Sequence, residues 1–301
     1  MYFDEVSSTS DSISKMSFVY ADVLTHKIQN ILQGRNNKII KDYFLYYSYR
    51  ERCKVKAVVI DMNSGYKSII RELFPNAKIV IDRFHIVQLV NRAFNKYRVS
   101  FMNSIKDKNK ELYRQLKCYW KNLLTSYDEL DNGTNKKFKY FKYITTEQEI
   151  VNYLIKQDSQ LYKCYWLIQD LREALENDDF DGFKALINDK STLPRYMFTA
   201  IKTLRKYKRQ IKNTMYYNGI SNGPLEGINN KIKVIKRISY GYRFFTNFKA
   251  KILLVFSLFT PTEAIKKPKY SKEERQDILT KKKTINLKRK NRKKALLLNI
   301  A

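Results

Sequence analysis

The sequence predicts a mixed α/β fold that is interrupted by an all-α segment, and three observations support this class. Short apolar runs rich in β-branched residues alternate with helical patterns in residues 1–90. Residues 83–215 lose these strand-like runs, and their apolar residues recur at helical spacing. An amphipathic helix then begins near Pro224. Such a series predicts a sheet flanked by helices.

The first 90 residues predict the order strand, strand, helix, strand, helix, strand. The expected ranges are 16–21 and 27–32 for a strand pair around a turn near Thr25 and His26, 37–47 for a helix, 55–60 for a buried strand, 66–74 for a helix and 77–81 for a second buried strand. Ahead of these elements, the chain begins with only three apolar residues. Three residues make a poor strand, so we expect this edge of the sheet to be frayed.

The middle of the chain, residues 83–215, predicts several helices packed as a bundle. Thr146 and Glu149 form a capping-box pattern ahead of a helix over 150–154. Asn132-Gly133 and residues 177–179 are typical of loops.

The last part predicts the helix from Pro224, a loop over 240–245, and an apolar helix ending near Phe259. From Lys266 the chain becomes a basic tail, which either binds DNA nonspecifically or only aids solubility.

The charge of the chain points to a polyanionic partner. Its 301 residues carry a formal net charge of +30, which favours nucleic acid. We find no apolar run of transmembrane length and no signal peptide, so a membrane is disfavoured. The cysteines are scattered, which fits a reducing cytoplasm, and only two histidines occur. Any metal must then be held by oxygen ligands, which favours Mg²⁺ or Mn²⁺.

The helix that follows Ser221 has two chemically distinct faces at about 100° per residue. Its apolar face holds Leu225, Ile228, Ile232 and Ile235. Its opposite face holds Glu226, Asn230, Lys233 and Arg237. A carboxylate followed by cations suits a metal-assisted phosphodiester enzyme, in which the acid binds an ion and the cations hold the phosphate backbone. An acid in a first turn also complements the helix dipole without any chemistry, so both interpretations stay open.

Several acids occupy positions where chemistry is expected. Asp4 follows the apolar start, Asp61 and Asp82 follow the two buried strands, and Glu226 begins the late helix. Two strand-end aspartates and one helical glutamate could hold two divalent ions. Asp61 could equally cap the next helix, and spacing alone does not rank these acids.

Five sequence motifs also resemble those of a known protein family. They are Val59-Ile60-Asp61-Met62-Asn63, Leu73-Phe74-Pro75-Asn76-Ala77, Asp82-Arg83-Phe84-His85-Ile86-Val87, the run from Ser221 to Arg237, and Tyr240-Gly241-Tyr242-Arg243. Their order and spacing, with Phe3-Asp4-Glu5 ahead of them, resemble those of bacterial insertion-sequence transposases, and most of all the DDE transposases of the ISL3 type. The resemblance runs from Phe3 to about Phe248.

That resemblance implies a ribonuclease-H-like mixed sheet flanked by helices and interrupted by a helical insertion. The implied parts are 1–91 and 216–260 for the catalytic domain, 92–215 for the insertion and 261–301 for the tail. It implies Mg²⁺- or Mn²⁺-dependent DNA cleavage and strand transfer, with two ions once DNA is bound. Its partners would be double-stranded DNA of the element ends and target, and further copies of the chain, in the bacterial cytoplasm.

The resemblance also assigns roles to individual residues. By motif, the catalytic and metal-binding acids would be Asp4, Asp61 and Glu226. The DNA contacts expected are Arg83, His85, Asn230, Lys231, Lys233, Lys236, Arg237 and Arg243, each of which could instead be an ordinary surface residue. His85 could also bond Asp82 to fix the strand end, so the roles of these two residues stay open.

The chain departs from the family in one respect. Full-length members carry an N-terminal zinc module and a helix-turn-helix, and this sequence begins almost at Asp4. We therefore expect the C-terminal catalytic part of a transposase. Two hypotheses follow, an active DDE enzyme or a catalytically inactive DNA-binding remnant.

Overall fold

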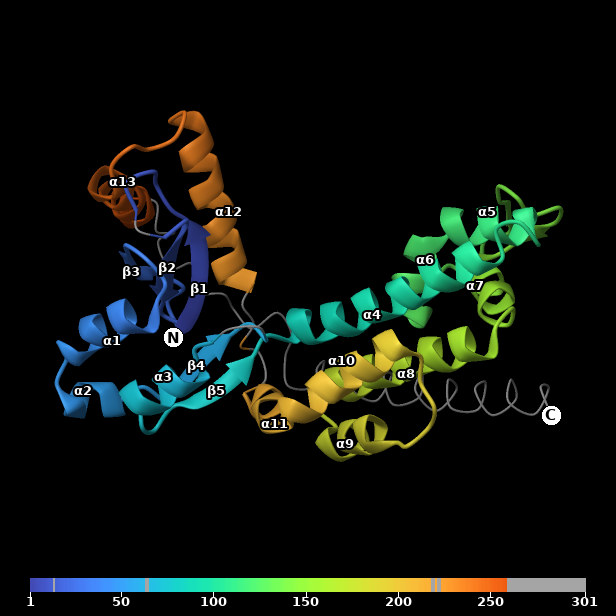
Figure 1. Ribbon diagram of the computed structural model, residues 1–301, viewed down its shortest axis with the longest axis horizontal. Helices are drawn as coiled ribbons and strands as arrows, with labels where there is room; N and C mark the ends of the chain where they lie inside the picture. The colour runs from blue at the N-terminus through green and yellow to red at the C-terminus, as the bar shows by residue number, and fades with distance from the viewer. Residues whose placement is uncertain (13, 63–64, 218–219, 221–222, 259–301) are drawn as a thin grey trace, which may run out of the picture. The chain divides into compact units, whose positions relative to one another are not determined.

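The structure is a computed structural model that describes residues 1–258, except residues 13, 63–64, 218–219 and 221–222 (Figure 1). Contacts divide the chain into one unit of residues 1–256 and another of residues 257–301. The predicted basic tail lies outside the described residues. Within them, no helix is long and apolar enough to cross a membrane.

Five strands form a mixed sheet in the order β3-β2-β1-β4-β5. Their bounds are Tyr2–Ser7 for β1, Met16–Ala21 for β2, Ile28–Leu32 for β3, Ala57–Ile60 for β4 and Lys78–Ile81 for β5. The first three are antiparallel to one another, whereas β1, β4 and β5 run parallel. The predicted class of a mixed sheet is confirmed, as are the four strands predicted after the apolar start.

The expected frayed first strand is wrong. Strand β1 has six residues and lies in the middle of the sheet, and its residues pair with β2 from Tyr2 opposite Ala21 to Ser7 opposite Met16. On its other side β1 pairs with β4, where the N–H of Val59 donates to the carbonyl of Met1 at 2.8 Å. The pairing with β2, which extends over the whole strand, holds polar residues in a strand that their propensity alone disfavours.

Aromatic side chains pack one face of the sheet, next to helices α1 (Asn37–Leu45), α2 (Tyr49–Cys53) and α3 (Lys67–Leu73). The rings of Phe3 and Phe18 lie 4.8 Å apart at 84° to one another. Phe44 of α1 stacks on Phe3 at 5.7 Å, and Phe74 meets Phe44 at 5.0 Å. Because side chains alternate along a strand, this packing directs Asp4 to the opposite face of the sheet.

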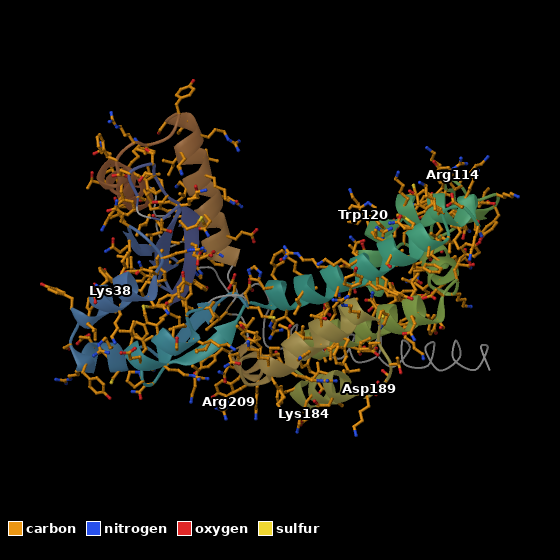
Figure 2. All side chains as sticks on the ribbon, in the orientation of Figure 1. Lys38, Arg114, Trp120, Lys184, Asp189 and Arg209 are labelled. Carbon is orange, nitrogen blue, oxygen red and sulfur yellow. The ribbon has the colours of Figure 1, made fainter. Side chains whose placement is uncertain are left out.

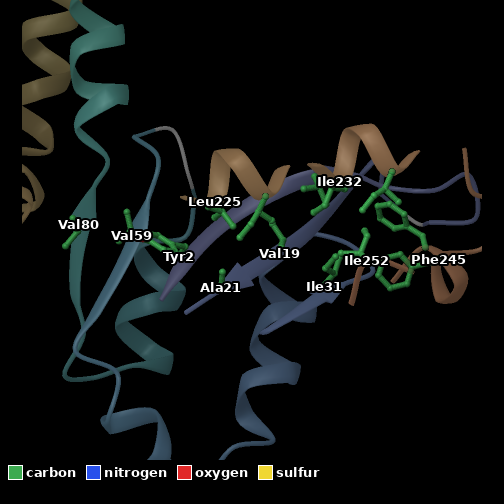
Figure 3. Close-up of a cluster of buried hydrophobic side chains, with 14 residues drawn as sticks. Tyr2, Val19, Ala21, Ile31, Val59, Val80, Leu225, Ile232, Phe245 and Ile252 are labelled. Atoms are coloured by element: carbon green, nitrogen blue, oxygen red, sulfur yellow. The ribbon is translucent and has the colours of Figure 1, made fainter. Parts of the chain in front are cut away.

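Helices α12 (Gly223–Ile238) and α13 (Phe245–Leu258) cover that opposite face, as Figure 3 shows. The predicted apolar stripe of α12 is buried there, at 0% exposure for Leu225 and 1% for Ile232. It packs against Tyr2, Val19 and other residues of the sheet. The predicted polar face, Glu226, Asn230, Lys233 and Arg237, is exposed. The two faces of this helix were therefore predicted correctly.

The middle of the chain is helical, as predicted. Its helices are α4 (Arg83–Ser104), α5 (Lys110–Cys118), α6 (Trp120–Leu124), α7 (Glu147–Ile155), α8 (Ser159–Glu176), α9 (Phe180–Asn188), α10 (Arg195–Lys206) and α11 (Lys208–Tyr216), with a 3₁₀ turn at Tyr127–Glu129. The expected absence of strands is wrong in one place, where β6 (Lys136–Lys137) and β7 (Ile144–Thr145) form a small hairpin-like pair. The capping box of Thr146 and Glu149 is confirmed at the start of α7.

Helix α11 returns from this segment to the edge of the sheet. The Thr214 hydroxyl accepts the N–H of Ile81 at 3.0 Å and lies 2.7 Å from the carbonyl of the same residue. The amide of Asn213 donates to the carbonyl of Ile79 at 2.8 Å. The free side of β5 is therefore hydrogen-bonded by side chains of α11.

Candidate active site

Strand register brings Asp4 and Asp61 to the same level of the sheet. Tyr2 lies opposite Val59 in the parallel pair of β1 and β4, so Asp4 and Asp61, two residues further along each chain, also lie opposite one another. Residues opposite each other in neighbouring strands point to the same face. In the next pair Ile60 lies opposite Ile81, which places Asp82 at this level too.

Both oxygens of the Asp4 carboxylate are held by the protein. The backbone N–H of Glu5 donates to Oδ1 at 2.7 Å, and Nδ2 of Asn229 on α12 donates to Oδ2 at 2.7 Å. Burial raises the pKa of Asp4, and the negative charge of Asp61 raises it further, against these two hydrogen bonds and the charge of His85. Asp4 is thus a partly buried carboxylate close to a second one, where a cation would be favoured.

Helix α12 presents two different polar residues near this site. Glu226, the acid predicted from the sequence, lies in the first turn and is exposed. Asn229, one turn later, is 8% exposed and reaches Asp4. Asn229 is not among the site residues predicted from the sequence. Its position between the apolar and polar faces, three residues after Glu226, was the available signal.

No three His, Cys, Asp or Glu side chains of the described segments lie close enough together to hold a metal ion. The predicted trio of Asp4, Asp61 and Glu226 is accordingly brought together only in part. Asp4 and Asp61 are neighbours, and Glu226 stands apart at the exposed start of α12.

A hollow of about 610 Å³ opens beside the two aspartates. Glu5, inside it, forms an ion pair with Arg35 and accepts a hydrogen bond from the Tyr66 hydroxyl at 2.8 Å. The lining residues are Phe3, Asp4, Glu5, Met16, Arg35, Asn36, Asn37, Asp61, Gly65 and Tyr66. This is an open, polar space bordered by the acids that the sequence singled out.

Asp82 has a local structural role. Its carboxylate accepts the N–H of Phe84 at 3.4 Å, and the residue is the N-cap of α4 and 5% exposed. His85 follows in the first turn, where its ring meets Phe84 edge-on at 5.5 Å. The positive charge of His85 lowers the pKa of Asp4, which places the imidazole within electrostatic reach of the site.

The predicted DNA-contacting residues fall into two groups. Some are engaged inside the protein. Arg83 pairs with Asp178 and donates to the carbonyl of Leu175 at 2.5 Å, and the Lys236 ammonium donates to the carbonyls of Ser7 and Ser8 at 3.0 and 2.7 Å. The Lys231 ammonium lies 4.7 Å from the ring centroid of Phe256. Others are exposed, namely Asn230, Lys233, Arg237 and Arg243.

A further group of cations surrounds Lys67 of α3. The ammonium of Lys67, at the start of α3, is 3.2 Å from the ring centroid of Tyr207, which joins α10 to α11. Burial lowers the pKa of Lys67, and the like charges of Lys206 and Arg71 lower it further. Burial and the charge of Asp61 raise the pKa of Tyr207. Lys67 is thus packed on an aromatic ring, within electrostatic reach of two further cations.

Cations also occur on helices away from the sheet. Figure 2 shows Arg114 on α5, Lys184 on α9 and Arg209 on α11, and all three are exposed. The positive charge of the chain is therefore spread over the helical segment as well as over α12.

Comparisons with known proteins show which sequences this chain resembles. Residues 2–252 match the family described as "Transposase", DDE_Tnp_ISL3. A Bordetella parapertussis protein, the transposase for insertion sequence element IS1001, is 26% identical over 244 residues, which are 79% of this chain and 56% of that protein. A Lactococcus lactis subsp. lactis protein named ATP-dependent protease is 37% identical over 150 residues, 46% of this chain and 48% of its own. The chain spans about half the length of these relatives, and no solved structure matches it.

Proposed function

This chain belongs to the DDE transposases of the ISL3 type, and from that premise we propose that it cleaves DNA and transfers the freed strand with Asp4, Asp61 and Glu226 as its catalytic acids. The observation that carries the proposal is the register that sets Asp4 beside Asp61 on the face covered by α12. The strand order β3-β2-β1-β4-β5 supports a ribonuclease-H-like catalytic fold.

The residues at this site fit a divalent ion. Asp4 and Asp61 offer carboxylate oxygens, and the buried Oδ1 of Asn229 has no hydrogen-bond donor in the described part of the chain. Hard cations such as Mg²⁺ and Mn²⁺ prefer such oxygen ligands. Two such ions, once bound with DNA, would supply the Lewis acidity that activates water or a 3′-hydroxyl and stabilises the leaving oxygen. Asp4, Asp61 and Glu226 would hold them.

The chain's own residues would bind and orient the DNA. The exposed cations of α12 would contact the DNA backbone together with Arg243, and the exposed Lys206 and Arg71 would add phosphate contacts. His85 would serve the same role from the start of α4. Of the other proposed contacts, Arg83, Lys231 and Lys236 are already engaged within the protein, so their first role would be structural.

The proposed domains follow the sequence division. Residues 1–91 and 216–260 would form the catalytic domain around the insertion of residues 92–215, although α4 runs unbroken through the first boundary. Oligomers of the chain would assemble on double-stranded DNA, at element ends and target.

A second function, DNA binding without cleavage, is favoured by one observation. Glu226 is exposed and stands apart from the aspartates, so the described conformation lacks a complete acidic trio.

The two functions are separated by nicking of supercoiled plasmid DNA in Mn²⁺. We expect parent protein to nick it, and the Asp61→Ala and Glu226→Ala variants to bind the DNA without nicking. Glu111→Ala, which removes an exposed acid from α5, is the matched control and should nick normally. Nicking that survives both active-site substitutions would refute the catalytic assignment, and salt-sensitive binding with no nicking by the parent would establish the second function.

A further inference from the structure

Asn229 makes a contact that the predicted catalytic trio does not include. It comes from the helix that carries Glu226, it is 8% exposed, and its Nδ2 donates to Oδ2 of Asp4 at 2.7 Å. The other oxygen of Asp4 accepts the backbone N–H of Glu5. With one oxygen held from its own strand and one held from α12, the carboxylate is fixed in orientation.

Packing alone gives no reason for an asparagine at this position. Its neighbours on the buried side of α12 are Leu225, Ile228 and Ile232, and they lie against the sheet. Asn229 is buried beside them, and its Oδ1 accepts no hydrogen bond from the described residues, which is a cost that an aliphatic side chain would avoid. The gain that offsets this cost is the hydrogen bond to Asp4.

The neighbouring amide shows that the position matters. Asn230 differs from Asn229 by one residue and is exposed on the face shared with Glu226. Because a helix turns about 100° per residue, only one of these two amides can point to the sheet. The chain therefore offers two adjacent amides, of which one reaches a catalytic candidate and one faces solvent.

We propose that Asn229 is a positioning residue that holds Asp4 in the orientation needed to bind a divalent ion and couples α12 to β1. This inference rests on the proposed function, since it assigns Asp4 to the ion site. Asn229 acts through Asp4. Its hydrogen bond holds the carboxylate of Asp4 in place, so that the remaining lone pairs of the carboxylate oxygens point in one direction. Residues that orient a metal ligand in this way strongly affect ion affinity.

The test is Mn²⁺ binding by calorimetry in the presence of a double-stranded DNA oligonucleotide, on variants whose fold is checked by thermal unfolding. We expect Asn229→Ala to bind Mn²⁺ about 10- to 100-fold more weakly than the parent protein, as for other residues that orient ligands. Asn229→Ser, which restores a donor, should recover part of the affinity. Asn230→Ala is the matched control and should bind as the parent does.

Each outcome decides one question. If Asn229→Ala and Asn229→Ser both bind Mn²⁺ like the parent protein while Asp61→Ala does not, the positioning role is refuted and the proposed function stands. If Asn229→Ala unfolds, the serine variant alone decides: weaker Mn²⁺ binding than the parent protein supports the positioning role, and binding equal to that of the parent refutes it. If the parent protein binds no Mn²⁺ with DNA present, the proposed function fails and this inference fails with it.

Discussion

Tyr2 of β1 lies directly opposite Val59 of β4, and this pairing sets the register of the candidate active site. It places Asp4 beside Asp61 on the face that α12 covers. A slip of one residue would turn Asp4 to the aromatic face beside Phe3 and separate the two carboxylates. The site therefore depends on a strand ladder whose two sides are far apart in the sequence.

The packing of α12 should dominate the stability of this part of the fold. Ile232 is 1% exposed and packs in the cluster under the helix, so Ile232→Ala should lower the free energy of unfolding by about 2–5 kcal/mol. Val234 on the same helix is 51% exposed, and Val234→Ala should change it by less than about 0.5 kcal/mol. Urea unfolding measures both, and equal effects would contradict the described burial.

Lys236 should contribute to stability more than to DNA affinity. Its ammonium donates to the carbonyls of Ser7 and Ser8 at the end of β1. Replacing it by Met removes these charge-assisted bonds, and we expect a loss of about 1–2 kcal/mol in urea unfolding. Affinity for a DNA oligonucleotide should change little. A large loss of DNA affinity with unchanged stability would contradict this and would show that Lys236 contacts DNA.

The exposed cations near Lys67 should contribute to DNA binding. Arg71→Gln and Lys206→Gln should each weaken binding, and the loss of one phosphate contact should reduce the slope of log affinity against log salt by about 1. Lys41→Gln removes the same charge from an ammonium already paired with Glu72, and is the control. Titrations of a fluorescent oligonucleotide at several salt concentrations measure the slopes, and equal slopes for all three variants would contradict a local site.

Asp131 should make the helical segment sensitive to acid. The N–H groups of Thr134 and Gly133 donate to its carboxylate at 3.0 Å and lower its pKa to about 2. A pKa that is depressed in the folded state adds stability at neutral pH, and this stability is lost as pH falls from about 4 toward 2.

The Asp131→Ala variant tests this pH dependence. It should melt below the parent protein at pH 7, and the gap in melting temperature should narrow in acid because the parent loses the carboxylate's contribution. Asp107→Ala, which removes an exposed acid, should show no such change between the two pH values. A gap that stays constant from pH 7 to pH 3 would contradict the assignment.

Periodicity explains which features could be predicted from the sequence. The two faces of α12 follow from 3.6-residue spacing, and the strands near residues 57–60 and 78–81 follow from short β-branched runs bounded by turns. Asp61 could be marked as a candidate because it follows a buried strand, whereas Asp4 lies inside β1 and was selected only through the resemblance to a known family. The helical spacing and the strand runs are local patterns, which a single sequence carries in full.

The features that were missed depend on contacts between distant segments. Strand β1 extends through Ser7 because β2 pairs with it over its whole length, whatever its own propensity. Asn229 meets Asp4 across 225 residues, and Lys67 meets Tyr207 across the whole helical segment. The spacing of residues within one helix or strand does not indicate such a contact between distant segments. The position of Glu226 relative to the aspartates was not predictable for the same reason.

The hydrogen bonds from side chains of α11 to the backbone of β5 affect how two copies of the protein can associate. An unpaired sheet edge is a template on which a strand from a neighbouring chain can add, and such addition leads to aggregation. Thr214 and Asn213 occupy the backbone groups of Ile81 and Ile79 on that edge. Copies gathered at high local concentration along DNA would therefore be unable to join through β5 without first displacing α11.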